Sequence, residues 1–371
     1  MGTVAFLPLH VKHGCPYDCT MEGCTTEAYN QWAGDALRKA IIDKQGQTAK
    51  ELVQAVPALR EQPLGADPGV SNEQTALGLA IGLQDVEVVR SLLEAGVSPD
   101  LALPPKQVSA PESVLPDPAM DFSALCLEPA TYFEAQCSAN RRPWFDLFLQ
   151  FNASADSGLI FACFGGDLEM MKILVDRRAD VNKLRRQNSP LTAACRSELD
   201  TAEKVRFLLE CKAEPNAKGG SIAEGCWFPP LTVAVRKKKY PVVRLLLEGG
   251  ADPNVVTSGE GLPNVIFWAV YWGDLELVKL FTSLSKHVLN LRATKYTSED
   301  VIDVARTSLG FAKMRKPHHI QKLPLPNRPA IVCEQILRLL EQYCAEHPDG
   351  QETGEAVGTS RRSVYLSARK V

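Results

Sequence analysis

One phrase occurs four times along the chain, and it limits the possible folds more than any other feature. The copies are EVVRSLLEAGVSPD (87–100), EMMKILVDRRADVN (169–182), KVRFLLECKAEPN (204–216) and VVRLLLEGGADPN (242–254). The spacing of the apolar residues in each copy predicts one stripe of an amphipathic helix. The small residues and the closing Asp or Asn predict a helix end followed by an extended turn. Because it recurs, the turn is a structural element and not a catalytic loop.

A shorter motif, an apolar anchor with a small residue three positions later, recurs upstream of these helices. The pairs are Leu77/Ala80, Leu159/Ala162, Leu191/Ala194, Leu231/Ala234 and Ile266/Ala269, with weaker copies at Leu37/Ala40 and Ile302/Ala305 and a defective one at Leu125/Glu128. Successive anchors from Leu37 to Ile302 lie 40, 48, 34, 32, 40, 35 and 36 residues apart. A period of roughly 33 residues with insertions is typical of helix–turn–helix–loop repeats.

At these motifs the chain resembles the ankyrin repeat family. The resemblance is carried by QTALGLAIGLQDVEVVRSLLEAGVSPD, SPLTAAC and PPLTVAV with VVRLLLEGGADPN, and it extends over about residues 34–345. It implies an all-α fold, an ankyrin-repeat solenoid of about seven to eight helix-turn-helix units with hairpin loops, some of them degenerate. The histidine usual after the anchor is replaced by Gly78, Ile160, Thr192, Thr232 and Phe267.

Composition and repeat pattern predict the organisation of the chain. The predicted segments are an N-terminal arm with Cys and His (1–30), ankyrin units 1–2 (31–98), a Pro-rich insertion (99–118), a degenerate ankyrin unit (119–155), ankyrin units with a split C-terminal cap and an insertion at 310–329 (156–345), and a disordered tail (346–371). The aromatic residues of the degenerate unit must be buried, and RPWFDLFLQF is its second helix. We interpret the Pro-rich segment as an inert insertion; the alternative is a docking peptide for a proline-recognising domain. A final helix is expected at 330–347.

The net charge, the length of the apolar runs and the cysteine count make several classes of protein improbable. The formal net charge of −3 favours neither nucleic acid nor an anionic membrane as the main partner. No apolar run approaches the roughly 18–20 residues that span a bilayer, and the N-terminal stretch has no secretory signal. Eleven scattered cysteines indicate reduced thiols instead of a disulfide framework. We therefore expect a cytoplasmic protein, with the nucleus as the alternative.

The N-terminal arm contains a group of candidate metal ligands. His10, His13, Cys15, Cys19 and Cys24 lie within fifteen residues, and imidazole and thiolate are the ligands that tetrahedral zinc prefers. The close Cys-x-x-Cys pair of such sites is missing, and no second ligand pair follows. We predict no metal and no cofactor; a metal-binding or redox function of the arm, with the repeats as a targeting module, is the alternative.

The sequence contains no recognisable catalytic motif: no Gly-x-Ser-x-Gly, no Walker loop and no His-Glu-x-x-His. Cys163 and Cys195 directly follow the motif alanine, and we interpret them as small core residues. We therefore predict that the protein is not an enzyme.

The resemblance implies that partners bind at the hairpin tips and on the inner face of the first helices. That face takes the residues five and six positions after each anchor. These positions and the hairpin give the predicted partner-binding residues Phe164, Arg196, Trp227, Phe228, Arg236, Lys237, Tyr271 and Trp272.

Because Tyr, Trp and Arg dominate binding hot spots, these residues predict a protein-binding scaffold or adaptor that uses its concave face. An acidic segment with an apolar anchor would complement them, and we expect a monomer. Binding of nucleic acid through basic patches such as RKKKY (236–240) is the disfavoured alternative, because the net charge is negative.

Overall fold

A computed structural model describes residues 26–62, 64, 75–103, 131–185, 188–199, 201–217, 228–255, 265–284, 288–291, 301–302, 305 and 329–347. This part of the chain is helical and contains no strand, which confirms the all-α prediction. The described residues also form two isolated antiparallel β-bridges, Ala102–Thr131 and Arg185–Asn188. The chain divides into two compact units, Met1–Glu224 and Gly225–Val371.

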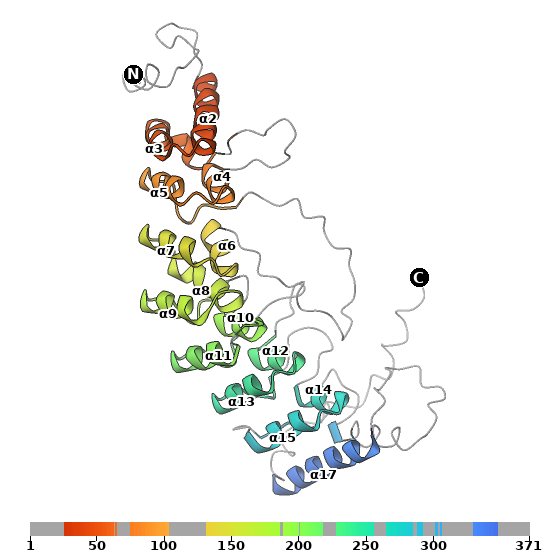
Figure 1. Cartoon of the computed structure of the whole chain (residues 1–371). Helices are drawn as coiled ribbons and strands as arrows, with labels where there is room; N and C mark the ends of the chain where they lie inside the picture. Colours follow the sequence, from red (N-terminus) through yellow and green to blue (C-terminus); the bar gives the residue numbers. More distant parts are fainter. Residues whose placement is uncertain are drawn as a thin grey trace, which may run out of the picture. The chain divides into compact units, whose positions relative to one another are not determined.

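The first unit consists of helical hairpins that follow one another in chain order (Figure 1). Its helices are α2 (Thr26–Ile42), α3 (Gly46–Ala55), the short 3-10 helix η1 (Pro57–Arg60), α4 (Ala76–Gly82), α5 (Val86–Glu94), α6 (Tyr132–Ser138), α7 (Arg142–Gln150), α8 (Ala155–Phe164), α9 (Leu168–Asp176), α10 (Pro190–Arg196) and α11 (Thr201–Glu210). First helices pack on first helices, as α8 does on α6 and α10, and second helices on second helices, as α3 does on α5. Each hairpin therefore buries its apolar stripe against its neighbours.

The second unit repeats this arrangement. Its helices are α12 (Pro230–Arg236), α13 (Tyr240–Glu248), α14 (Val265–Trp272), α15 (Leu275–Leu284) and the longer α17 (Ala330–Glu346). α12 packs on α14, α13 packs on α15, and α17 packs on α15 (Figure 1). The last of these helices lies where the sequence predicts the closing helix, and the Tyr343 hydroxyl accepts a hydrogen bond from the backbone N–H of Leu289 at 3.0 Å.

The residue that closes the repeated phrase joins one hairpin to the next. In the first unit, Asn182 Nδ2 donates to the carbonyl of Lys212 at 3.2 Å, and its Oδ1 accepts from the N–H of Glu214 at 2.8 Å. We call this pair of hydrogen bonds an asparagine bracket. It satisfies backbone groups in the following turn that no helix pairs.

The second unit contains a bracket of the same form. Asn254 Nδ2 donates to the carbonyl of Val288, and its Oδ1 accepts from the N–H of Asn290, both at 2.7 Å. At the corresponding place in the first copy of the phrase, the Asp100 carboxylate accepts from the N–H of Ser154 at 2.9 Å. The recurrence of Asp or Asn at this place follows from this bonding.

The degenerate unit is a helical hairpin formed by α6 and α7. Phe133 is its buried anchor, and Gln136 occupies the place of the motif alanine. Phe133 lies 5.9 Å from Phe145 and 6.0 Å from Phe148 between ring centres, and all three are 0% exposed. α7 matches the predicted second helix, whereas Leu125, the anchor that the motif indicated, lies outside the described residues.

α6 continues the stack from α4 although residues 104–130 intervene in the sequence. The Tyr132 hydroxyl and Thr75 Oγ1 share a buried hydrogen bond of 2.8 Å. Gly78 has no side chain, which leaves the space that the Tyr132 ring fills. The N–H of Tyr132 also donates to the carbonyl of Leu101 at 3.1 Å. Residues 101–102 and 131–132, on either side of segment 104–130, therefore lie beside each other.

Candidate functional site

The first unit contributes two of the predicted partner-binding residues, Arg196 and Phe164. Arg196 is only 3% exposed, and its Nη1 donates to Asn188 Oδ1 at 2.9 Å. Its guanidinium is therefore held within the first unit, and its role as a partner contact stays a prediction. Phe164, at the end of α8, is half-buried.

A second arginine, Arg185, connects the loop before α10 to helices α8 and α6. The Arg185 guanidinium lies 5.7 Å from the centre of the Phe161 ring and pairs with both carboxylate oxygens of Glu134, at 2.7 and 2.9 Å. Glu134, in α6, is 0% exposed. The ion pair therefore fixes this loop across α8 to α6.

The core of the first unit also contains a lysine. Lys204 is fully buried, and its Nζ donates to the carbonyl of Gly166 at 2.7 Å and to Ser197 Oγ at 2.8 Å. Cys163 and Cys195 are both 0% exposed, which confirms that they are core residues. Burial raises the pKa of the Cys163 thiol well above its ordinary value, so this thiol is not a nucleophile at neutral pH.

In the second unit, the end of α12 places a cation close to two aromatic rings. The Arg236 guanidinium carbon lies 5.8 Å from the centre of the Phe228 ring and 5.9 Å from that of the Trp268 ring. Burial lowers the pKa of Arg236 from its ordinary value, yet a guanidinium in a protein remains charged. Phe228 is only 2% exposed. Phe228 therefore contacts Arg236 from within the unit, and its role as a direct partner contact stays a prediction.

Helix α14 has an apolar side chain or an aromatic one at every position. Val265, Ile266, Ala269 and Val270 form its buried side. The remaining residues are aromatic and half-buried, and we call them the aromatic face: Phe267, Trp268, Tyr271 and Trp272. A helix of a globular protein normally presents polar residues there.

The four rings of the aromatic face contact one another in two parallel pairs. Phe267 and Tyr271 stack with 6.2 Å between ring centres and 7° between planes, and Trp268 and Trp272 stack at 5.3 Å and 28°. Trp268 meets Tyr271 edge-on, at 5.7 Å and 90°. The result is a set of mutually fixed rings with Arg236 against one of them.

The sequence rule identified Tyr271 and Trp272 but missed Phe267 and Trp268. The spacing of the four aromatic residues, i, i+1, i+4 and i+5, could have found them, because such residues share one side of a helix. Trp227, the remaining predicted contact in this unit, lies outside the described residues.

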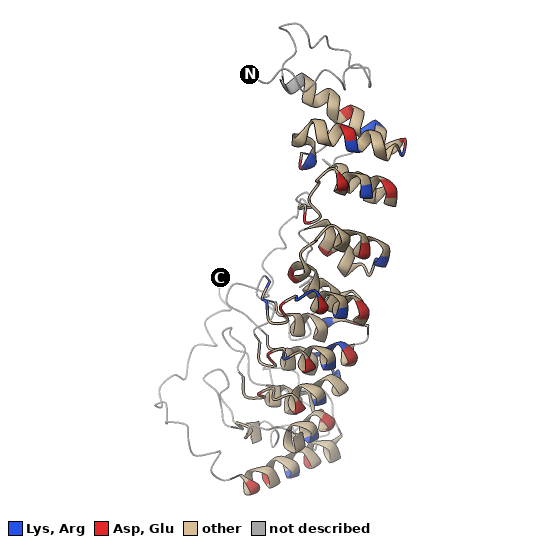
Figure 2. Cartoon of the chain, turned by 90° about the vertical axis from the view of Figure 1, so that its left-hand side faces the viewer, with Lys and Arg blue, Asp and Glu red and all other residues tan. Residues whose placement is uncertain are grey.

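Four consecutive basic residues, Arg236 to Lys239, end α12 and form the turn to α13. Lys237 and Lys239 are half-buried and Lys238 is exposed. Acidic and basic residues are otherwise interspersed along the helices of each unit (Figure 2). The basic turn is therefore a local feature next to the aromatic face.

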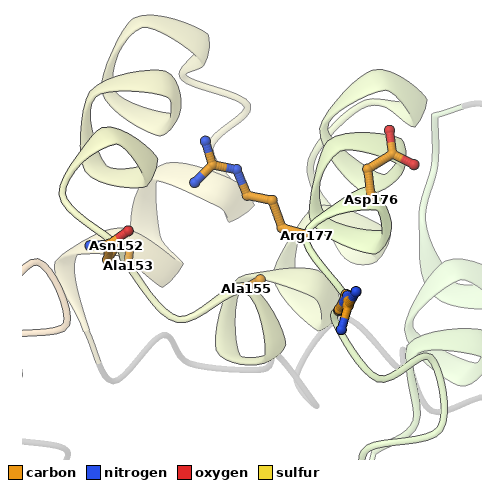
Figure 3. A pocket seen from close by; sticks show the side chains of 6 residues that line it. Asn152, Ala153, Ala155, Asp176 and Arg177 are labelled. Atoms are coloured by element: carbon orange, nitrogen blue, oxygen red, sulfur yellow. The ribbon is translucent and has the colours of Figure 1, made fainter.

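A shallow pocket of about 410 Å³ lies in the first unit between the α7–α8 turn and the end of α9 (Figure 3). It is lined by Asn152, Ala153, Ala155, Asp176, Arg177 and Arg178. Arg177 extends toward the preceding hairpin, and its Nη1 donates to the carbonyl of Leu149 at 2.7 Å (Figure 3). This lining does not combine a nucleophile with a base.

The candidate metal ligands His10, His13, Cys15, Cys19 and Cys24 lie outside the described residues. Within the described ranges, no group of three or more His, Cys, Asp or Glu residues could hold a metal ion. Of the helices that the structure describes, none has the length and apolarity needed to cross a membrane.

Comparison with known proteins agrees with the helical hairpins. Residues 136–219 match a family model of ankyrin repeats in three copies, and residues 231–282 match one of ankyrin repeats in many copies. The ankyrin repeat and KH domain-containing protein mask-1 of Caenorhabditis elegans is 29% identical over 134 residues. This match spans 36% of the chain but only 5% of the worm protein.

Among solved structures, the crystal structure of the human ASB11 ankyrin repeat domain is similar, with a TM-score of 0.39 and 19% sequence identity. The similarity covers 62% of this chain and 89% of that chain. Ankyrin repeats are in general protein–protein interaction modules without catalytic activity. With helical hairpins at both matched segments and the repeated phrase in each, residues 136–219 and 231–282 of the chain are ankyrin repeats.

Proposed function

We propose that this protein is a non-catalytic scaffold or adaptor, and that its partner binds the surface formed by α12 and α14. The observation that carries the proposal is the aromatic face. Four large, half-buried rings on one short helix leave apolar surface in contact with water, which is unfavourable unless a partner covers it. Arg236 and Lys237 lie at the edge of this surface. Aromatic residues and arginine are the residues that dominate binding energy at protein interfaces.

The chemistry of the surface favours an acidic protein segment with an apolar anchor. The ring pair Trp268–Trp272 would bury an apolar side chain, and the basic end of α12 would pair with carboxylates. In the first unit, Arg196 is buried against Asn188 and is not part of the proposed surface. The proposed surface is therefore confined to the second unit.

Single-stranded nucleic acid is the second candidate, because aromatic rings beside basic residues also bind stacked bases. The interspersed charges along the helices and the formal net charge of −3 weigh against it. Nucleic-acid binding would weaken steeply with salt and would be abolished by nuclease treatment of a cell lysate.

The test is quantitative capture from native lysate with the full chain as bait. The double variant Arg236→Glu, Trp272→Ala is compared with the unchanged protein and with a matched control, Arg338→Glu, Ile331→Ala. The control changes a basic and an exposed apolar residue of α17, in the same unit.

If the proposal is right, a few proteins disappear with the site variant alone and survive nuclease treatment. Those proteins must then bind the purified chain directly, with at least a tenfold loss for the site variant. Identical captures with all three baits would refute the proposed surface.

A further inference from the structure

The pocket beside the α7–α8 turn is lined by two residues that hold equivalent places in consecutive hairpins. Asn152 is the second residue after α7, and Arg178 is the second residue after α9. Their backbones are left-handed, with φ of +61° and +65°. Glycine adopts this conformation without strain, and Gly96 and Gly250 stand at this place in two other hairpins. The turn itself therefore requires no side chain, and Arg178 places a charged one here.

The polar side chains of this lining have donors to spare. Arg177 also lines the pocket and uses one of its nitrogens, Nη1, to hold the carbonyl of Leu149 at 2.7 Å. Within the part of the chain that the structure describes, the side chains of Asn152 and Arg178 have no hydrogen-bond partner. Over the same residues, the carboxylate of Asp176 pairs with neither arginine, and it extends in a different direction from Arg177 (Figure 3). Two guanidinium groups, each with five N–H donors, therefore line one pocket without a carboxylate that neutralises them.

The number of donors favours a phosphate monoester over a carboxylate. A carboxylate has two oxygens, and one guanidinium fork satisfies both of them. A phosphate monoester carries a charge of roughly −1.5 to −2 and three strong acceptor oxygens, so two guanidinium groups and a carboxamide can bind it together. The pocket volume of about 410 Å³ suits a small ligand. Because Asp176 is part of the lining, the ligand is favoured if it carries a basic group beside its phosphate.

We infer that this pocket binds a phosphate monoester that has a basic group beside it. Arg178 and Asn152 bind the phosphate, and Arg177 adds its remaining N–H groups. Asp176 pairs with the basic group of the ligand. A phosphorylated side chain of a protein and a small phosphorylated molecule share this chemistry, and the test distinguishes the two sources. The site lies in the first unit, so it does not depend on the proposed function of the α12–α14 surface.

The test titrates the full chain with two small phosphate monoesters and screens it against an array of phosphoserine peptides with varied neighbours. Phosphoethanolamine has an ammonium group beside its phosphate and glycerol 3-phosphate has none, so phosphoethanolamine should bind about threefold more tightly. In the array, Lys or Arg next to the phosphoserine should be enriched. If the best peptide binds about tenfold more tightly than phosphoethanolamine, the source is a phosphorylated protein; if the two affinities are equal, it is a small molecule.

Three variants separate the roles of the lining, and all should melt at the temperature of the unchanged protein. Arg178→Gln removes a charge and should weaken phosphate binding about tenfold. Asn152→Gly keeps the left-handed backbone, removes the carboxamide and should cost about threefold. Asp176→Asn should abolish the preference for phosphoethanolamine over glycerol 3-phosphate. The matched control is Arg206→Gln, which removes an exposed arginine of α11 in the same unit and should change nothing.

Three results would overturn the inference. The first is that neither small ester and no phosphopeptide binds at concentrations up to about 1 mM. The second is that Arg206→Gln weakens binding as much as Arg178→Gln, because binding would then follow net charge and not the pocket. The third is that the best peptide binds as tightly with glutamate in place of phosphoserine, which would exclude selectivity for phosphate. None of these results bears on capture by the α12–α14 surface, which is tested with variants of the second unit.

Discussion

The asparagine bracket in the second unit should contribute measurably to the stability of the fold. In Asn254→Ala, the carbonyl of Val288 loses its donor and the N–H of Asn290 loses its acceptor, each now at 2.7 Å. A hydrogen bond in a protein contributes roughly 0.5–1.5 kcal/mol net. Since water can reach both groups, we take the middle of that range for each bond. The alanine variant should then lose about 2 kcal/mol of unfolding free energy.

The aspartate variant separates the two bonds. Asn254→Asp keeps the acceptor for the N–H of Asn290 but places a carboxylate oxygen against the carbonyl of Val288. It should lose at least the donated hydrogen bond, about 1 kcal/mol. Because two oxygens then face each other, the loss should be no smaller at low salt than at high salt.

The assay combines global and local readouts. Urea unfolding followed by tryptophan fluorescence gives the free energy, and amide hydrogen exchange at Asn290 reports the bond itself. The control is Asn182→Ala, which should speed exchange at Glu214 and leave Asn290 unchanged. If Asn254→Ala costs less than about 0.5 kcal/mol and Asn290 exchanges as before, water replaces the bracket and the reasoning fails.

Three further predictions concern the backbone, a buried ion pair and a tyrosine. Gly250 has a φ of +93° and no atom within 4 Å of an added Cβ, so Gly250→Ala should lose about 1 kcal/mol in urea unfolding through backbone strain alone. Arg185→Met should cost about 3 kcal/mol because it leaves the buried Glu134 without its cation. Glu134→Gln should cost less, since the Arg185 side chain is 31% exposed and can reach water; equal losses at pH 7 would contradict this. Burial, with the hydrogen bond to Asp274, raises the pKa of Tyr240 from 10.0 to about 12. The associated stabilisation is present below pH 10 and is lost as the pH rises toward 12. Tyr240→Phe should therefore remove a step near pH 12 from the ultraviolet tyrosine titration.

The helices could be predicted from the sequence because their determinants are local. The apolar stripe and the small-residue turn of each repeated phrase lie within one helix and its end. For the site, the rule chose residues by their distance from an anchor, and their role in binding stays a prediction. It selected Tyr271 and Trp272 but passed over Trp268, although all three lie on one side of α14.

The opposite surroundings of Arg196 and Arg236 could not be predicted from position within the repeat. Both satisfy the same rule, and the deciding residues are the side chains of Asn188 and Phe228 in the preceding loop. The ion pair that holds the loop before α10 joins residues 51 positions apart in the sequence. Such contacts depend on the stacking of three hairpins, which no single repeat contains.

The contacts between residues 101–102 and residues 131–132 have a consequence for how the sequence of this protein can change during evolution. The bridge between Ala102 and Thr131 and the hydrogen bond from Tyr132 to Leu101 hold the flanking residues together independently of what connects them. Doubling the length of a flexible connection adds only about 0.6 kcal/mol of closure cost. We therefore expect that residues inserted, removed or exchanged between 103 and 131 leave the helices on either side in register.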